Sequence, residues 1–374
     1  PLSVTMTQAR TLQANFASST PSTKQWTGTG LWESSGNWDP VGMPASWDYA
    51  IIRSGTVQLG YSRYARTLVI SNGATMLFTN WTAKLTVSNV TVRSGAKITL
   101  PGAFTTSQMS NRVNFVCTNF TLDAGGTIDA DGKGWSFNNG PGAGNGGWHC
   151  SGGGYGGKGG IANNTGATAG KPYGSTSAPI APGSGGGGAA GYGGQGGGVV
   201  RIQAVGTVTV NGLITANGSN TTSYGYGGGS GGGVYITCQA FGGTTNGLIR
   251  VNGGVPANSG WHSGGGGGGR IAVNYTSLAS PHGTRFQSKA STDGFAESYP
   301  DLKWAFGSEA GTVWLSNTSI LSSVINNGQF GGCLLVIPGF SSLTVGNLTV
   351  SNATFRLAEH GFYLNVTNDL RILA

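Results

Sequence analysis

The chain has 374 residues, of which 9% are charged, 37% are apolar and 71 are glycine. Disorder goes with high net charge and few aromatic residues, so this composition argues against it. The net charge of +8 would suit nucleic acid or acidic glycans, but the basic residues are scattered singly, and we attribute the charge to a shortage of acids. We therefore expect no nucleic-acid partner. No apolar stretch is long enough to span a bilayer, so we also expect no membrane insertion in this segment.

The cysteines leave two alternatives open. Cys117, Cys150, Cys238 and Cys333 are far apart and form no Cys-x-x-Cys pair, which argues against a structural zinc site. They form either one or two disulfides in an oxidising compartment or buried free thiols.

In chain order, the first segment is residues 1–23. Residues 1–16 alternate as one or two strands do, and residues 17–23 have the composition of a linker. The strand pattern resembles the closing strands of the InlB-type B repeat of bacterial surface proteins, a likeness limited to these residues. An unpartnered strand of this kind is a candidate for addition to another subunit's sheet edge. The chain starts at Pro1 and stops at Ala374 inside a strand-like pattern, so we interpret it as part of a longer polypeptide.

Residues 24–131 are predicted to be the first coils of a right-handed parallel β-helix. Their opening pattern, with Trp26, Trp32 and Trp38 beside Gly and Pro, resembles the first coil of β-helical stretches in autotransporter-like bacterial surface proteins. It is expected to cap the open end of the solenoid, and a tryptophan platform for sugar is the alternative. From residue 56 to 122, short strands alternate with turns such as Ser71-Asn72-Gly73-Ala74.

Residues 132–269 hold 50 of the 71 glycines and no acidic residue. Strand-like pieces recur within them at an offset of 35 residues, which places Leu213-Ile214 on Leu248-Ile249. A fixed period of this size predicts a solenoid, with the glycine runs as inserts on one side. We expect Leu213, Ile214, Val234, Ile236, Leu248 and Ile249 to point into its core.

The glycine runs 183–198, 225–233 and 264–269 are long enough for two or three turns of an extended helix. Without Cβ atoms, such chains can pack side by side as polyglycine-II helices and hydrogen-bond laterally. Disordered inserts are the alternative. The repetition of the runs in step with the strands favours ordered stacking.

Residues 270–309 are predicted to be an irregular aromatic loop, and residues 310–374 the C-terminal β-helix coils. Several motifs, among them Tyr155-Gly156-Gly157-Lys158-Gly159-Gly160 and Ala310-Gly311-Thr312-Val313-Trp314-Leu315, resemble the glycine-rich right-handed β-helix surface proteins of environmental bacteria, giant extracellular proteins. This resemblance covers about residues 24–374. It implies an all-β fold and an extracellular or cell-surface location rather than an activity.

No motif predicts catalysis. Polysaccharide lyases and hydrolases on β-helices need clustered carboxylates, and the nearest approach here is the pair Asp129 and Asp131, which share one face of a strand. His149 and His262 have similar sequence contexts beside Cys150, but two such ligands and a thiol are few for a metal. We therefore expect no catalytic residue, no cofactor and no metal site.

Eleven Asn-x-Ser/Thr sequons are candidates for glycosylation, although most coincide with strand starts. They are Asn80, Asn89, Asn119, Asn163, Asn217, Asn220, Asn274, Asn317, Asn347, Asn352 and Asn365.

The sequence as a whole predicts a non-enzymatic extracellular structural protein. We expect a rigid solenoid subunit of a surface filament, sheath or adhesin that assembles head to tail into a homopolymer and contacts surface glycans. The competing interpretation is a carbohydrate-binding or lyase-like β-helix protein. Head-to-tail contact through residues 1–16 and continuation of the chain beyond Ala374 are alternative ways to cover the exposed ends.

Overall fold

The computed structural model describes residues 20–105, 108–162, 166–189, 191–257, 263–291, 307–325 and 328–373. The protein is all-β, and its described residues contain a single 3₁₀ turn, Ser35–Asn37. None of the described helical residues forms a helix long and apolar enough to cross a membrane. Residues 1–16 lie outside the described ranges.

Strands dominate the fold from end to end. In chain order they are β1 (Thr23–Trp26), β2 (Thr29–Leu31), β3 (Trp38–Asp39), β4 (Tyr49–Ile52), β5 (Thr56–Leu59), β6 (Arg63–Ile70), β7 (Thr75–Phe78), β8 (Leu85–Val92), β9 (Lys97–Thr99), β10 (Val113–Leu122), β11 (Thr127–Asp129), β12 (Val199–Ala204), β13 (Thr207–Val210), β14 (Leu213–Thr215), β15 (Gly233–Gly243), β16 (Leu248–Arg250), β17 (Arg270–His282), β18 (Arg285–Gln287), β19 (Thr312–Leu315), β20 (Val324–Ile325), β21 (Phe330–Val336), β22 (Ser342–Ser351), β23 (Thr354–Leu357) and β24 (Tyr363–Leu373).

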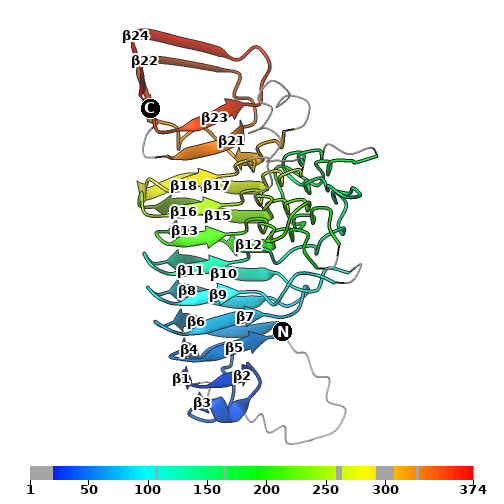
Figure 1. The fold of residues 1–374 in the computed structure, drawn as a ribbon. Coiled ribbons are helices and arrows are strands. Elements are labelled where there is room, and N and C mark those ends of the chain that lie inside the picture. Colours follow the sequence, from blue (N-terminus) through cyan, green and yellow to red (C-terminus); the bar gives the residue numbers. More distant parts are fainter. Residues whose placement is uncertain are drawn as a thin grey trace, which may run out of the picture.

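The strands stack in parallel, layer upon layer, along one axis (Figure 1). One ladder joins β2, β5, β7, β9, β11, β14, β16 and β18 in chain order. Another begins with β6, β8 and β10 and continues through β12, β15, β17 and β19. Each strand therefore has both of its edges hydrogen-bonded to neighbours one layer away, except at the ends of the stack.

The inner face is a continuous apolar core. Side chains alternate along a strand, so every second residue of β5 and β7 faces inward and is buried, and in β8 the alternation restarts after the exposed Ser88 and Asn89. The core is rich in β-branched and aromatic side chains, with ring contacts such as Phe78 on Phe115 and Phe286 on Phe330. Because each layer is only a few strands wide, a layer buries its apolar side chains chiefly against the layers above and below.

Glycine defines the turn after β4, β6, β8 and β10. Gly55, Gly73, Gly95 and Gly125 occupy equivalent turns with φ between 74° and 82°. This left-handed region is costly for residues with a Cβ atom, so the sequence has glycine at this place in each layer. The backbone N–H of Gly73 donates to Gly95 and that of Gly95 to Gly125, which stacks the turns themselves.

The first layer closes one end of the stack, as the sequence predicts. Trp26, Trp32 and Trp38 are buried and pack edge to face, with ring centroids 5.2 and 5.0 Å apart. The short β3 pairs antiparallel with β1 and covers its outer edge. Because these three indoles are buried, they form a cap and not a platform for sugar.

The predicted repeat is confirmed in part. Ile214 lies opposite Ile249 at an offset of 35 residues, and both are buried. Leu213 and Leu248 are also paired but only half-buried, so the prediction that they point into the core is wrong. Adjacent residues of a strand face opposite sides, and their isoleucine neighbours take the inner side.

The offset of 35 residues does not hold for β12, which precedes β14 in the chain. Val200 pairs with Val234 and Ile202 with Ile236, an offset of 34 residues. An offset of 35 would place Arg201 opposite Ile236 and turn a charge into the core, because a slip of one residue exchanges the two faces of a strand. The offset is 33 residues where Thr207 pairs with Ala240, and it reaches 35 only where Leu213 pairs with Leu248.

Residues 270–309 differ from the irregular loop that we expected. Residues 270–287 form β17 and β18, which continue both ladders, and residues 292–306 lie outside the described ranges. Near the C-terminus, β20, β22 and β24 leave the main sheet and form a separate parallel sheet of three strands, visible at the red end of Figure 1.

The register predicts that two neighbouring substitutions differ sharply. Ile249→Asp buries a carboxylate without a partner and should lower the free energy of unfolding by about 3 kcal/mol or more. Leu248→Asp places the same group on the outer face opposite Arg285 and should cost less than about 1 kcal/mol. Urea unfolding followed by circular dichroism measures both; equal losses would contradict the register.

Candidate functional site

The glycine-rich segments gather on one side of the strand stack (Figure 1). They belong to no strand, yet their backbones are hydrogen-bonded to one another. Along residues 227–232 the N–H groups donate in turn to segments 183–187, 264–267 and 216–219, and they return to the same segment at every third residue. A repeat of three residues means that the backbone rotates by a third of a turn per residue.

The carbonyl groups of the same segment face three further neighbours. They accept hydrogen bonds from residues 194–197, from Gly153 and from Gly254. Six separate pieces of chain therefore surround residues 227–232, and each is attached through main-chain atoms. This arrangement satisfies the backbone groups of a buried segment that has almost no side chains.

The close approach of these backbones explains the composition. A Cβ atom on Gly229 would lie 2.0 Å from the carbonyl oxygen of Gln195, and one on Gly228 would lie 2.0 Å from that of Gly254. The exception within the segment is Ser230, whose Oγ accepts a 2.8 Å hydrogen bond from the N–H of Ser184. Ser184 and Ser230 are both fully buried, so a hydroxyl is tolerated only where it is hydrogen-bonded.

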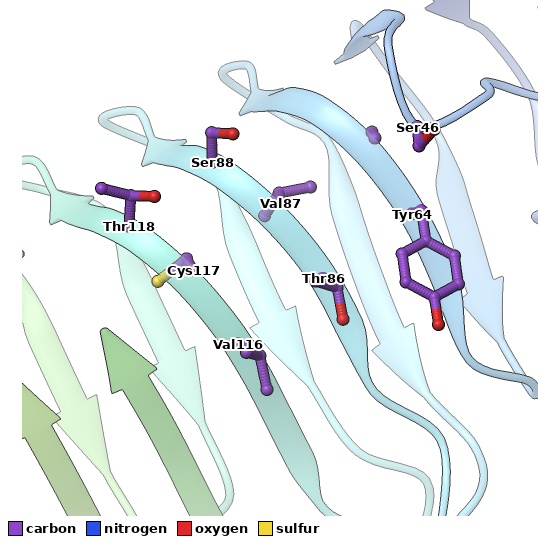
Figure 2. A pocket seen from close by; sticks show the side chains of 9 residues that line it. Ser46, Tyr64, Thr86, Val87, Ser88, Val116, Cys117 and Thr118 are labelled. Carbon is purple, nitrogen blue, oxygen red and sulfur yellow. The ribbon is translucent and has the colours of Figure 1, made fainter. Parts of the chain in front are cut away.

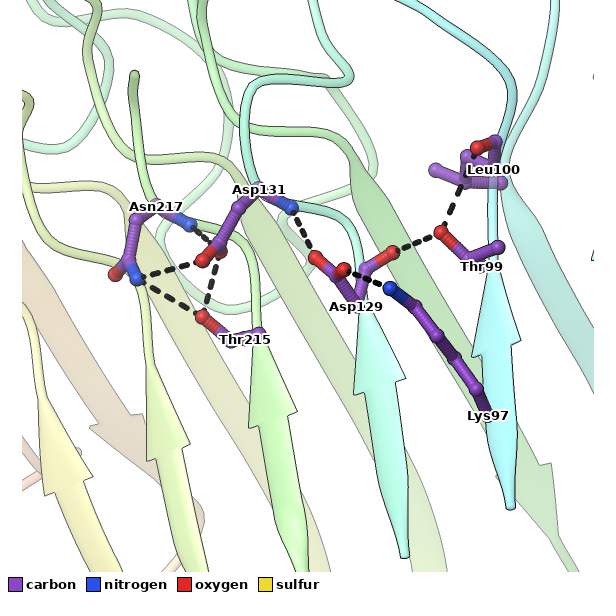
Figure 3. Close-up of polar contacts among 7 residues, drawn as sticks. All are labelled: Lys97, Thr99, Leu100, Asp129, Asp131, Thr215 and Asn217. Atoms are coloured by element: carbon purple, nitrogen blue, oxygen red, sulfur yellow. Dashed lines mark hydrogen bonds and ion pairs between the residues drawn. The ribbon is translucent and has the colours of Figure 1, made fainter. Parts of the chain in front are cut away.

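Asp129 and Asp131 are held in place by different partners (Figure 3). Lys97 Nζ lies 2.6 Å from Asp129 Oδ2. Burial alone would raise the pKa of Asp129, but the hydrogen bonds from Lys97 and from the N–H of Asp131, together with the charges of Lys97 and Lys133, outweigh it and lower the pKa. Asp131 Oδ1 accepts hydrogen bonds of 2.6 Å from Thr215 Oγ1 and from the N–H of Asn217. Both carboxylates thus bind residues of neighbouring strands, and the pair joins successive layers.

The Asp131 contact continues as a ladder. Asn217 Oδ1 accepts from the N–H of Asn252 at 2.7 Å, and Asn252 Oδ1 accepts from the N–H of Lys289 at 2.9 Å. Asn217 and Asn252 are 35 residues apart, which is the period of the sequence repeat. Just after β11, β14 and β16, a side-chain oxygen therefore accepts a hydrogen bond from a backbone N–H of the next layer.

The remaining candidates for metal binding do not meet among the described residues. His149 is described, whereas His262 lies outside the described ranges. Within those ranges, no group of three or more His, Cys, Asp or Glu side chains is placed to hold a metal ion. The four cysteines are free and buried, so thiols and not disulfides are present.

The sequons differ in how far their amides are engaged. Asn217 Nδ2 donates to Asp131 and Thr215, Asn119 Nδ2 donates to Asn89, and Asn317 Nδ2 donates to the carbonyl of Tyr275. Asn163 lies outside the described residues. Glycosylation of the sequons stays a prediction.

A shallow groove of about 330 Å³ crosses the outer face of β6, β8 and β10. Figure 2 shows Tyr64, Thr86 and Val116 at matching places on these three strands, with Ser46 from a neighbouring loop. The lining contains no carboxylate, imidazole or amine. It therefore offers hydroxyl groups and one exposed ring for binding, but no acid–base pair.

The stack has an open apolar face at its C-terminal end. A cavity of about 180 Å³ there is lined only by apolar residues, including Phe340, Phe355 and Phe362. Leu370 and Ile372 of β24 contribute to the lining, and Ile372 is 75% exposed. Among the described residues, β24 is also an edge strand, since it pairs there with β22 on one side only.

The sequence analysis did not predict the groove. It also did not predict that Arg112, just before β10, lies near Arg201 of β12. Their residues are far apart along the chain, and the strand register brings them together. Comparison with models of protein families, with curated proteins and with solved structures finds no match to this chain.

The crowding of the glycine segments predicts the effect of a single methyl group. Gly229→Ala should lower the free energy of unfolding by about 1–3 kcal/mol, because the new Cβ meets a backbone carbonyl that cannot move aside. Gly102→Ala is the matched control, since a Cβ there has no neighbour within 4 Å. Chemical denaturation compares the two; an unaffected Gly229→Ala variant would refute the close packing.

The buried thiols predict a loss of stability in alkali. Burial raises the pKa of Cys117, Cys238 and Cys333 from 9.0 to about 12. Between these two pKa values the unfolded chain releases thiol protons that the folded chain retains. The contribution of each protonated thiol to the free energy of unfolding is therefore complete below pH 9 and is lost as the pH rises toward 12. Each thiol should add a slope of up to about 1.4 kcal/mol per pH unit.

Cys333→Ala isolates one such contribution. The free energy of unfolding of this variant should fall less steeply between pH 9 and 11 than that of the unchanged protein. A thiol reagent at pH 8 should label the folded protein slowly and label four cysteines after denaturation. Identical slopes, together with rapid labelling of the folded protein, would show that the thiols are accessible.

Proposed function

We propose that the protein is an extracellular structural subunit, a rigid rod that assembles end to end into a surface filament or sheath. The observation that carries the proposal is the contrast between the two ends of the stack. Trp26, Trp32, Trp38 and β3 close the first layer, whereas the last layer has an apolar cavity and the unpaired edge of β24. Unequal ends favour a head-to-tail contact, which does not close on itself and so forms a fibre.

We propose that residues 1–16 of one copy supply the missing contact. Their strand-like alternation suits addition to the free edge of β24, and their apolar side chains suit the cavity lined by Leu370 and Ile372. Strand addition of this kind uses main-chain hydrogen bonds for affinity and side-chain pockets for specificity.

The rod itself is proposed to be a right-handed parallel β-helix. Parallel pairing of β4 with β6, β6 with β8 and β8 with β10, each from one layer to the next, supports this assignment, because crossover connections between parallel strands are almost always right-handed. The flank is proposed to be a bundle of polyglycine-II helices, since three residues per turn is the repeat of the polyproline II conformation. A rod whose flank is braced by main-chain hydrogen bonds would resist bending, as a filament subunit must.

Carbohydrate binding is the second candidate function. The groove with Tyr64 exposed by 52% and hydroxyl groups along its floor favours it. An aromatic face beside hydroxyl groups is a common surface for a sugar ring. We propose that neither function involves catalysis.

The assembly proposal predicts that one exposed side chain controls the oligomeric state. Ile372→Asp should leave the free energy of unfolding nearly unchanged, because Ile372 is mostly exposed, and should abolish higher oligomers. Asn368→Asp introduces the same charge at another exposed position of β24 and is the control. Deletion of residues 1–16 should have the same effect as Ile372→Asp.

Sedimentation velocity over a range of concentrations, with electron microscopy of the samples, measures the outcome. Fibres or a ladder of oligomers are expected for the unchanged protein. A chain that sediments as a monomer at the highest concentration would disprove the assembly.

A further inference from the structure

Two arginines with no acidic partner lie side by side on the outer face of the stack. Arg112 directly precedes β10, and Arg201 is the third residue of β12. The register pairs Val113 with Val200 and Asn114 with Arg201, and the valines face inward. Because side chains alternate along a strand, Arg112, Asn114 and Arg201 all belong to the outer face.

The charges of both arginines are left without a counterion among the described residues. Neither side chain has an ion pair there, and the Nε atom of each is buried without a hydrogen-bond partner. The guanidinium of Arg112 lies over the ring of Trp81, 4.7 Å from its centroid. Burial and, after it, the nearby charge of Arg201 lower the pKa of Arg112. Two like charges held together and partly desolvated are stabilised by an anion, and guanidinium groups suit carboxylate and sulfate oxygens.

The residue paired with Arg201 is not open to a ligand. Asn114 is 3% exposed, its Nδ2 atom donates to the carbonyl of Ala83 at 3.4 Å, and its Oδ1 atom is buried. Tyr235 lies on the other side of Arg201, as its partner on β15. The two guanidinium groups therefore supply the contacts to an anion, and the surface beside them supplies the contacts to the rest of the ligand.

The shallow groove continues this site along the surface. Val116, two residues after Asn114, lines the groove, as does Thr86, two residues after the exposed Lys84. Tyr64 lies on the next strand, β6. The cations thus lie beside a strip of hydroxyl groups and an exposed aromatic ring, which suits a sugar that carries an acidic group.

We propose that this strip binds an acidic polysaccharide without cleaving it. A carboxylate or sulfate group lies between Arg112 and Arg201, and a following sugar ring packs on Tyr64. The inference rests on the carbohydrate-binding candidate and is independent of end-to-end assembly. It gives the protein a means of attachment to an anionic glycan layer.

Affinity electrophoresis in gels containing polygalacturonate, alginate or chondroitin sulfate tests the proposal, with neutral dextran as the comparison. Arg201→Gln and Arg112→Gln should each weaken binding to the acidic glycans by about tenfold or more. Lys171→Gln removes an exposed charge from the glycine-rich flank and should change binding less than about twofold. Arg201→Lys retains the charge but not the planar set of N–H donors of a guanidinium group. Its loss of binding should lie between those of Arg201→Gln and Lys171→Gln.

Retention of acidic glycan by the Arg201→Gln and Arg112→Gln variants would overturn the proposal, as would equal retention by dextran. Stronger binding to single-stranded DNA than to polygalacturonate would point to a nucleic-acid surface instead. Competition by sulfate alone at millimolar concentration, with no binding of polymer, would reduce the site to an adventitious anion site. The Ile372→Asp protein should bind glycan normally, so failure of assembly and failure of glycan binding are separate results.

Discussion

Contact between backbones is the constraint on which this structure depends. In the strand stack, each layer hydrogen-bonds to the layers above and below it, and in the glycine-rich flank each segment hydrogen-bonds to several others. The flank buries few side chains, so the hydrophobic effect contributes little there. Its order depends on the absence of Cβ atoms, because carbonyl oxygens occupy the space that such atoms would need.

The stack and the flank depend on each other. Glycine has a high entropic cost of ordering, and an isolated glycine-rich chain would not recover that cost by burial. Here the strands β12, β15 and β17 emerge from the glycine segments, which places those segments at fixed positions and in a fixed order. The rigid stack thus lowers the entropy that the flank has to lose on folding. The flank in turn covers one side of the stack.

The same stacking brings functional candidates together. Asp131, Asn217 and Asn252 form a ladder because they occupy one corner in successive layers. Arg112 and Arg201 become neighbours because β10 pairs with β12 across the whole glycine-rich insert between them. In both cases parallel pairing turns residues that are distant in sequence into an array with the spacing of strands. Such arrays suit ligands that are themselves repetitive, as polysaccharides are.

Local patterns predicted a large share of the fold. Alternating apolar residues predicted the strands, sequences such as Ser71-Asn72-Gly73-Ala74 predicted the turns between them, and the tryptophans predicted a cap. The 35-residue repeat placed Ile214 on Ile249. The repeat failed for Val200 and Val234, which pair at an offset of 34 residues because the connecting segments differ in length. It placed Leu213 opposite Leu248 correctly, but these leucines are only half-buried because their isoleucine neighbours face the core. The loop predicted over residues 270–309 failed because Tyr275 and Phe286 are core residues of β17 and β18.

The sequence by itself determined the all-β character and the place of the glycine-rich flank, since alternation and the absence of side chains are local properties of a chain. Only the tertiary structure decided which residues meet on the outer surface. Arg112, Arg201 and Tyr64 stand alone in the sequence, with no motif around them, and the cysteines were consistent with disulfides or thiols. Their surroundings are set by the register between layers, and that register depends on packing over distances that no local pattern records.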